Sequence, residues 1–138
     1  MEKFIIPKDK RLFVKWIVKY SFYNNLIVII ESSEQGASEF LSLYAKQTDL
    51  PPTAQHHYNK TCLIVSFINM NYNDDVIEYL LKNVHVLSIH NSKEMKFLIA
   101  DDFNEECFSC SKDFYYKHYD NLIKMGLINT NYDNRHLS

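Results

Sequence analysis

The sequence predicts a single α/β domain, with a mixed β-sheet of about four to five strands covered by helices on both faces. Short apolar, largely β-branched runs at residues 26–30 and 61–68 are typical of strands buried in a sheet. They alternate along the chain with amphipathic stretches of helical period, a pattern that indicates parallel strands joined by helical crossovers. The expected element order is α-β-α-β-α-β-β-α, over residues 1–128.

The first helix and the first strand are predicted from the spacing of apolar residues. Over residues 7–20, apolar side chains recur at intervals of three and four, while lysine and arginine fall on the opposite side. This pattern predicts an amphipathic, basic helix with Pro7 in its first turn. The run Leu-Ile-Val-Ile-Ile at residues 26–30 then predicts a buried strand.

A second helix is expected directly after this strand. Ser32 or Ser33 is suited to its N-cap, and the apolar stripe that follows ends near Gln47. Two consecutive prolines come next, and the residue before a proline is disfavoured in the helical conformation. We therefore expect a loop over residues 48–60.

The second half of the chain begins with another strand and helix. The strand at residues 61–68 is followed by Asn73 or Asp74, either of which suits the N-cap of a third helix. Residues 84–89 and 95–100 are two further strands, and their short polar connection indicates an antiparallel hairpin.

The last part of the chain is expected to end in a helix. Residues 103–110 suit either a loop or a final edge strand, and Ser111 suits the N-cap of a helix that runs to about Met125. Gly126 stands where a helix ends. Residues 129–138 form a polar tail that we expect to be flexible.

Composition excludes several classes of protein. The chain has 138 residues, of which 46% are hydrophobic, and a formal net charge of −2, so it is expected to fold around a core. Only 2 glycines are present, which argues against a glycine-rich phosphate-binding loop. A sequence pI of about 6.3 argues against a nucleic-acid-binding protein. No apolar run approaches the ~20 residues of a membrane span.

The cysteines indicate a reducing compartment. Three cysteines and no secretory signal predict a cytoplasmic protein without a disulfide framework. Cys107 and Cys110 have the C-x-x-C spacing of a zinc or redox pair, but no second such pair accompanies them. Ordinary packing is the simpler interpretation, and no cofactor or metal is expected.

Charge is distributed unevenly along the chain. Residues 1–20 hold six cations and two anions, a net charge of +4, whereas residues 71–106 hold three cations and eight anions, a net charge of −5. The acidic residues admit three interpretations: helix caps and a solvated loop, a surface for a basic partner, or a Mg²⁺ site. The Mg²⁺ site would use Glu31, Asp101 and Asp102, because each follows a predicted strand.

The favoured hypothesis is a non-enzymatic protein-binding module. No catalytic motif is present, and the abundance of lysine and asparagine is typical of an AT-rich gene. We therefore expect a small bacterial immunity protein that neutralises a basic nuclease-type toxin. The alternative is a metal-dependent phosphoryl-transfer or nuclease-like enzyme using Glu31, Asp74, Asp101 and Asp102. The residues predicted to contact the partner are Asp74, Asp75, Glu78, Asp101, Asp102, Glu105, Glu106, Tyr115, Tyr116 and Tyr119.

Overall fold

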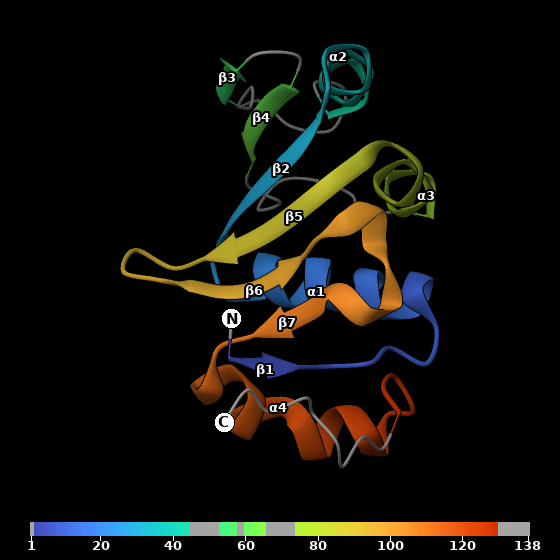
Figure 1. The fold of residues 1–138 in the computed structure, drawn as a ribbon, viewed down its shortest axis with the longest axis vertical. Coiled ribbons are helices and arrows are strands. Elements are labelled where there is room, and N and C mark those ends of the chain that lie inside the picture. The colour runs from blue at the N-terminus through green and yellow to red at the C-terminus, as the bar shows by residue number, and fades with distance from the viewer. Residues whose placement is uncertain (1, 45–52, 58–59, 66–73, 130–138) are drawn as a thin grey trace.

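The computed structural model describes residues 2–44, 53–57, 60–65 and 74–129 (Figure 1). The helices are α1 (Lys10–Tyr23), α2 (Glu34–Tyr44), α3 (Asp74–Asn83) and α4 (Lys112–Lys124). The strands are β1 (Lys3–Phe4), β2 (Ile27–Ser33), β3 (Thr53–His57), β4 (Lys60–Val65), β5 (Val84–His90), β6 (Met95–Ile99) and β7 (Phe108–Cys110). Two 3₁₀ turns, η1 (Asp101–Phe103) and η2 (Glu105–Cys107), connect β6 to β7. The predicted α/β fold is confirmed.

The sheet differs from the predicted one in its pairing. Within the described residues it has seven strands in the order β1-β7-β6-β5-β2-β4-β3, and every neighbouring pair is antiparallel. The expectation of a mixed sheet with parallel pairs is therefore wrong. The segment β2-α2-β3-β4-α3-β5 has the element order of the ferredoxin-like, or split βαβ, arrangement.

The unpredicted strand β3 accounts for this difference. It lies within residues 48–60, where a loop is predicted, because its sequence Thr-Ala-Gln-His-His lacks apolar alternation. Since β3 pairs antiparallel with β4, and β4 with β2, the crossover through α2 joins two strands that run in the same direction with β4 between them. The helical connections are thus present as predicted, but each has an antiparallel strand inserted between the strands that it joins.

Most helix ends lie where capping residues predict them. Ser111 accepts a hydrogen bond from the backbone N–H of Phe114 and begins α4. Gly126 follows that helix with φ +72°, a conformation that favours glycine. The first helix is an exception: Asp9 caps it by accepting from Leu12, so it begins at Lys10 instead of in the turn of Pro7.

The apolar core lies on one face of the sheet. Val28, Leu87, Phe97 and Phe108 are fully buried, and the strand register places them on the same face. Phe97 is central, because its ring centroid lies 5.5 Å from that of Phe13 in α1 and 5.3 Å from that of Phe114 in α4. Phe97 therefore contacts both α1 and α4, and Phe108 adds a second contact to α1, its ring centroid 5.6 Å from that of Phe13.

The helices gather on that face, which corrects the prediction that they cover both. α1 and α4 contact Phe97, and α3 lies beside α1. α2 packs against α3, because the Phe40 and Tyr79 rings lie 5.9 Å apart and the Tyr79 hydroxyl donates to the carbonyl of Gly36. Figure 1 shows α1 behind β6 and β7 and no helix in front of them. One solvated face is common in antiparallel sheets.

A helix that crosses a membrane must be both long and apolar. None of the described helices, within residues 2–44 and 74–129, combines the length and apolar character that crossing a bilayer requires. The predicted tail, from residue 130 onward, lies outside the described residues.

Phe97 provides the first test of this architecture. Phe97→Ala removes a ring with no exposed surface that two helices contact, so it should lower the free energy of unfolding by about 3–5 kcal/mol. Tyr116→Ala, at a position 70% exposed, should change it by about 0.5 kcal/mol or less. Urea unfolding followed by circular dichroism measures both, and equal losses would contradict a core centred on Phe97.

Candidate functional site

The predicted partner-binding residues fall into three separate groups. The first lies on α3, which packs beside the basic helix α1. Lys15 Nζ lies 3.1 Å from Asp74 Oδ1, and Arg11 forms an ion pair with Glu78. The hydrogen bond from Lys15 lowers the pKa of Asp74 below its ordinary value. Much of the positive charge of α1 is thus paired with α3 inside the molecule, and Asp75 is exposed beside these pairs.

The second group surrounds a pocket at one end of the sheet. The pocket has a volume of about 370 Å³ and is lined by Glu31, His85, Val86, Asp101 and Asp102. The Nδ1 atom of His85 contacts the Asp102 carboxylate. Three of the four carboxylates in the predicted metal set therefore meet, whereas Asp74 lies with Lys15 on α1.

Strand direction explains why Glu31 and Asp101 meet. β2 and β6 each pair antiparallel with β5, so they run in the same direction and their carboxyl ends reach the same edge of the sheet. Glu31 belongs to the end of β2, and Asp101 follows β6 by two residues. The sequence-based expectation that these carboxylates lie at one edge of the sheet is correct, although it assumed parallel pairing that the sheet does not have.

An unusual turn presents the carboxylates at this edge. Asp101, Asp102 and Phe103 have φ values of 51°, 56° and 63°, all in the left-handed region. That conformation costs L-residues about 1–2 kcal/mol each, although aspartate tolerates it better than most. The Phe103 ring is buried and packs edge-on against Phe108, which stabilises the turn by roughly 1.5–3 kcal/mol.

Backbone hydrogen bonds hold the segment that follows the turn. We call residues 101–106 the acidic loop, because it carries Asp101, Asp102, Glu105 and Glu106, all of them exposed. The N–H of Asn104 donates to the carbonyl of Asp101 at 3.0 Å, and the N–H of Ala100 donates to the carbonyl of Cys107 at 3.2 Å. The Asn104 side chain also accepts from the N–H of Glu106. Backbone hydrogen bonds therefore join the two ends of the loop, and the Asn104 side chain stabilises its interior.

The carboxylates of the acidic loop differ from those of α3 in their partners. In the part of the chain that the structure describes, no lysine or arginine forms an ion pair with Asp101, Asp102 or Glu105. Asp102 pairs with His85 instead. The loop thus keeps a concentration of negative charge at the surface.

A metal site requires several ligands placed around one point. Among the described residues, no three histidine, cysteine, aspartate or glutamate side chains are placed to hold one metal ion. Cys107 and Cys110 are both free thiols. Cys110 is buried, and burial raises the pKa of its thiol to about 12, so that side chain is protonated at neutral pH and packs as a small apolar group.

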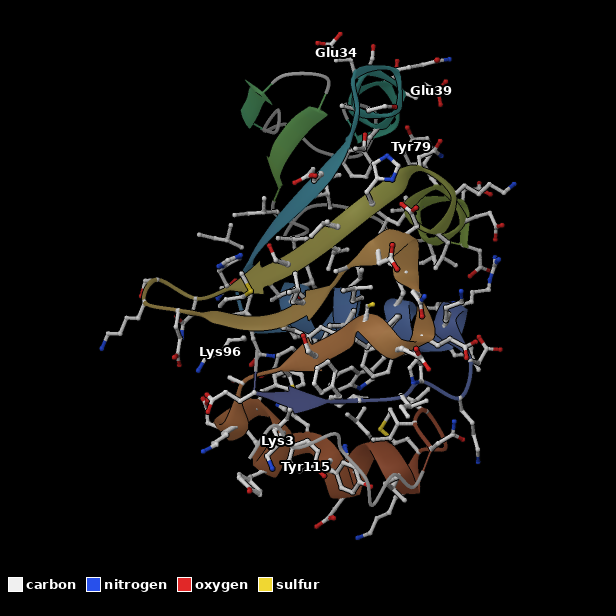
Figure 2. All side chains as sticks on the ribbon, viewed as in Figure 1. Lys3, Glu34, Glu39, Tyr79, Lys96 and Tyr115 are labelled. Atoms are coloured by element: carbon white, nitrogen blue, oxygen red, sulfur yellow. The ribbon has the colours of Figure 1, made fainter. Side chains whose placement is uncertain are left out.

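The third group consists of tyrosines on α4. Tyr115 and Tyr119 lie with ring centroids 4.7 Å apart, and Lys3 Nζ lies 5.3 Å from the Tyr115 centroid and 5.6 Å from that of Tyr116. Figure 2 shows Lys3 and Tyr115 side by side below β1. Along the chain, β7 lies between the acidic loop and α4.

Two pocket residues were not predicted from the sequence. His85 and Val86 line the pocket because the β2–β5 register shifts between Glu31 and Ser32, which leaves His85 outside the regular pairing. A β-bulge of this kind has no signal in the residues of β5 alone.

Comparison with protein-family models, with curated proteins and with solved structures gives no match to this chain.

The left-handed turn leads to a prediction about stability. At an ordinary position alanine is more stabilising than glycine, but at Asp102 the positive φ should reverse the order. Asp102→Gly should therefore be more stable than Asp102→Ala by about 1 kcal/mol in urea unfolding. At Glu105, where φ is not positive, the alanine variant should be the more stable, and the same order at both positions would exclude the turn described.

A second prediction concerns acid stability. Asp113 accepts a hydrogen bond from Lys96. Chiefly because of this hydrogen bond, the pKa of Asp113 falls to about 2. A carboxyl with a depressed folded-state pKa stabilises the fold above its unfolded pKa of about 4, and the contribution disappears as pH falls through about 2. Asp113→Asn should destabilise the protein at pH 7, and its difference from the wild type should shrink between pH 4 and about 2.

Urea unfolding at three pH values measures this difference. Asp120→Asn, in the same helix, serves as the control for removal of one exposed carboxylate. A difference between Asp113→Asn and the wild type that stays constant down to pH 2 would contradict the proposed role of the Lys96–Asp113 pair.

Proposed function

We propose that the chain is a non-enzymatic protein-binding module that takes a basic partner on its acidic loop. The observation that carries this proposal is the concentration of four exposed carboxylates within residues 101–106, where lysine and arginine pairing is absent for Asp101, Asp102 and Glu105 among the described residues. The acidic residues of α3, by contrast, are largely occupied by α1.

The held conformation of the loop supports this function. Because backbone hydrogen bonds and the buried Phe103 fix the turn, its carboxylates lose little conformational freedom when a partner binds. A fixed negative patch also attracts a positively charged partner at long range and raises the association rate. Tyr116, which is exposed on α4, remains a second predicted contact.

Within this class we favour a bacterial immunity protein that acts in the cytoplasm on a nuclease-type toxin. A nuclease must hold phosphates, so its substrate cleft is basic and is complementary to an acidic inhibitor. The free thiols of Cys107 and Cys110 are consistent with a reducing compartment.

The products of the genes that flank the gene for this chain provide the direct test. Each is expressed in a bacterial host with and without this protein. We expect one product to be basic, toxic alone and harmless when this chain is present, and to form a stable complex with it. If no flanking product is toxic, or if toxicity persists in the presence of this chain, the immunity function is wrong.

Matched charge removal then tests the role of the acidic loop. Glu105→Gln/Glu106→Gln should reduce the association rate with that toxin several-fold and weaken its dependence on salt. Glu34→Gln/Glu39→Gln makes the same chemical change at two exposed positions of α2, which Figure 2 shows on a different part of the molecule from β7, and should leave the rate unchanged. Stopped-flow binding at two salt concentrations measures both, and equal effects would remove the loop from the contact.

A further inference from the structure

The face of the sheet opposite the core carries no described helix. We call it the open face, and the strand register places on it Phe4, Ile27, Ile29, Glu31, Val86, Ser88, His90, Leu98 and Ser109. Its large side chains, Ile29, Val86 and Leu98, are half-buried by their strand neighbours, and Ile27 at its border is 43% exposed. All these residues alternate with the buried core residues of the same strands.

Strand register builds a shallow floor across the middle of the open face. Ser109 pairs with Leu98, Leu98 with Ser88, and Ser88 with Ile29, so large and small side chains alternate across four strands. The two serines are each only 6% exposed, and Ser88 Oγ lies 2.8 Å from His90 Nε2 on the same face. The surface is thus an apolar one with low points at the serines, which suits contact with protruding apolar side chains.

The acidic pocket borders this floor directly. Glu31 pairs with Val86, and both lie on the open face one row from Ile29 and Ser88. The same Val86 lines the pocket together with Asp101 and Asp102. The apolar floor and the negatively charged border are therefore continuous. Asp101 and Asp102 lie at the end of the strands that form the floor.

We infer that the open face is the main docking surface of this protein, and that its occupant is a basic protein segment whose apolar residues lie on Leu98, Ile29 and Val86. A lysine or arginine of that segment lies in the pocket between Asp101 and Asp102. This inference rests on the proposed function, since the acidic border is what selects a basic partner. It adds burial of apolar surface, which is the dominant favourable term in most protein–protein association.

Charge argues against two other occupants. A single-stranded nucleic acid needs cations for its phosphates, whereas the border of the open face is acidic. In a symmetric dimer formed through the open face, the acidic loops of two copies would both border one interface and repel each other.

Two peptides separate this inference from the proposed function. The probes are a 15-residue peptide of alternating leucine and lysine, and an oligolysine with the same number of lysines, each added to the full-length protein labelled for NMR. We expect the leucine–lysine peptide to shift the methyl signals of Ile29, Val86 and Leu98 together with the amides of the acidic loop. The oligolysine should shift the loop alone, because it has no apolar side chains to place on the floor.

Each other result has a defined meaning. If the leucine–lysine peptide shifts only the loop, the open face is not the docking surface, and the proposed function stands. If neither peptide shifts the loop, the inference and the acidic contact of the proposed function both fail. Binding of a 15-nucleotide single-stranded RNA to the open face would overturn the inference in favour of nucleic acid. Signals of the open face that move with protein concentration alone would overturn it in favour of a second copy.

A matched pair of variants provides the quantitative test. Leu98→Gln should weaken binding of the leucine–lysine peptide about tenfold, the loss expected when one central apolar contact is removed. Leu12→Gln makes the same change at a residue of α1 that is 53% exposed in the helical layer, and should alter the dissociation constant by less than about twofold. Unfolding curves of both variants establish that they remain folded, and equal effects on binding would overturn the inference.

Discussion

Phe97 packs two of the helices, α1 and α4, against the sheet. Its ring is buried between Phe13 of α1 and Phe114 of α4, and Ile99 lies two residues further along the same strand and face. Because side chains alternate along a strand, committing Phe97 and its neighbours to the core commits residues such as Leu98 to the other face. The open face is therefore a direct consequence of how the core is built.

The elements of the fold could largely be predicted from local signals, but the way in which strands pair could not. Ser111 and Gly126 bound α4 as capping rules require, since those rules depend on the backbone within one turn. Pairing depends on every strand being counted. The polar residues of β3 have no periodic signal, and omitting β3 reverses the expected direction of β4 relative to β2.

The sequence located the acidic residues but not the charges that neutralise some of them. Glu78 pairs with Arg11, which lies 67 positions earlier, and Asp74 pairs with Lys15, 59 positions earlier. Such pairs depend on helices packing side by side, which composition does not encode. The basic region at residues 1–20 and the acidic region at residues 71–106 therefore form, in part, one ion-paired interface. The net charge of −5 over residues 71–106 overstates the free acidic surface.

The acidic loop is the place where the chain departs most from local backbone preference. Three consecutive L-residues in the left-handed region oppose folding, and the burial of Phe103 offsets part of that cost from within the turn itself. The turn places Asp101 and Asp102 at the pocket that Val86 of the open face also lines. Strain that is retained beside an acidic pocket, with a buried phenyl ring to hold it in place, is what a surface preorganised for binding requires.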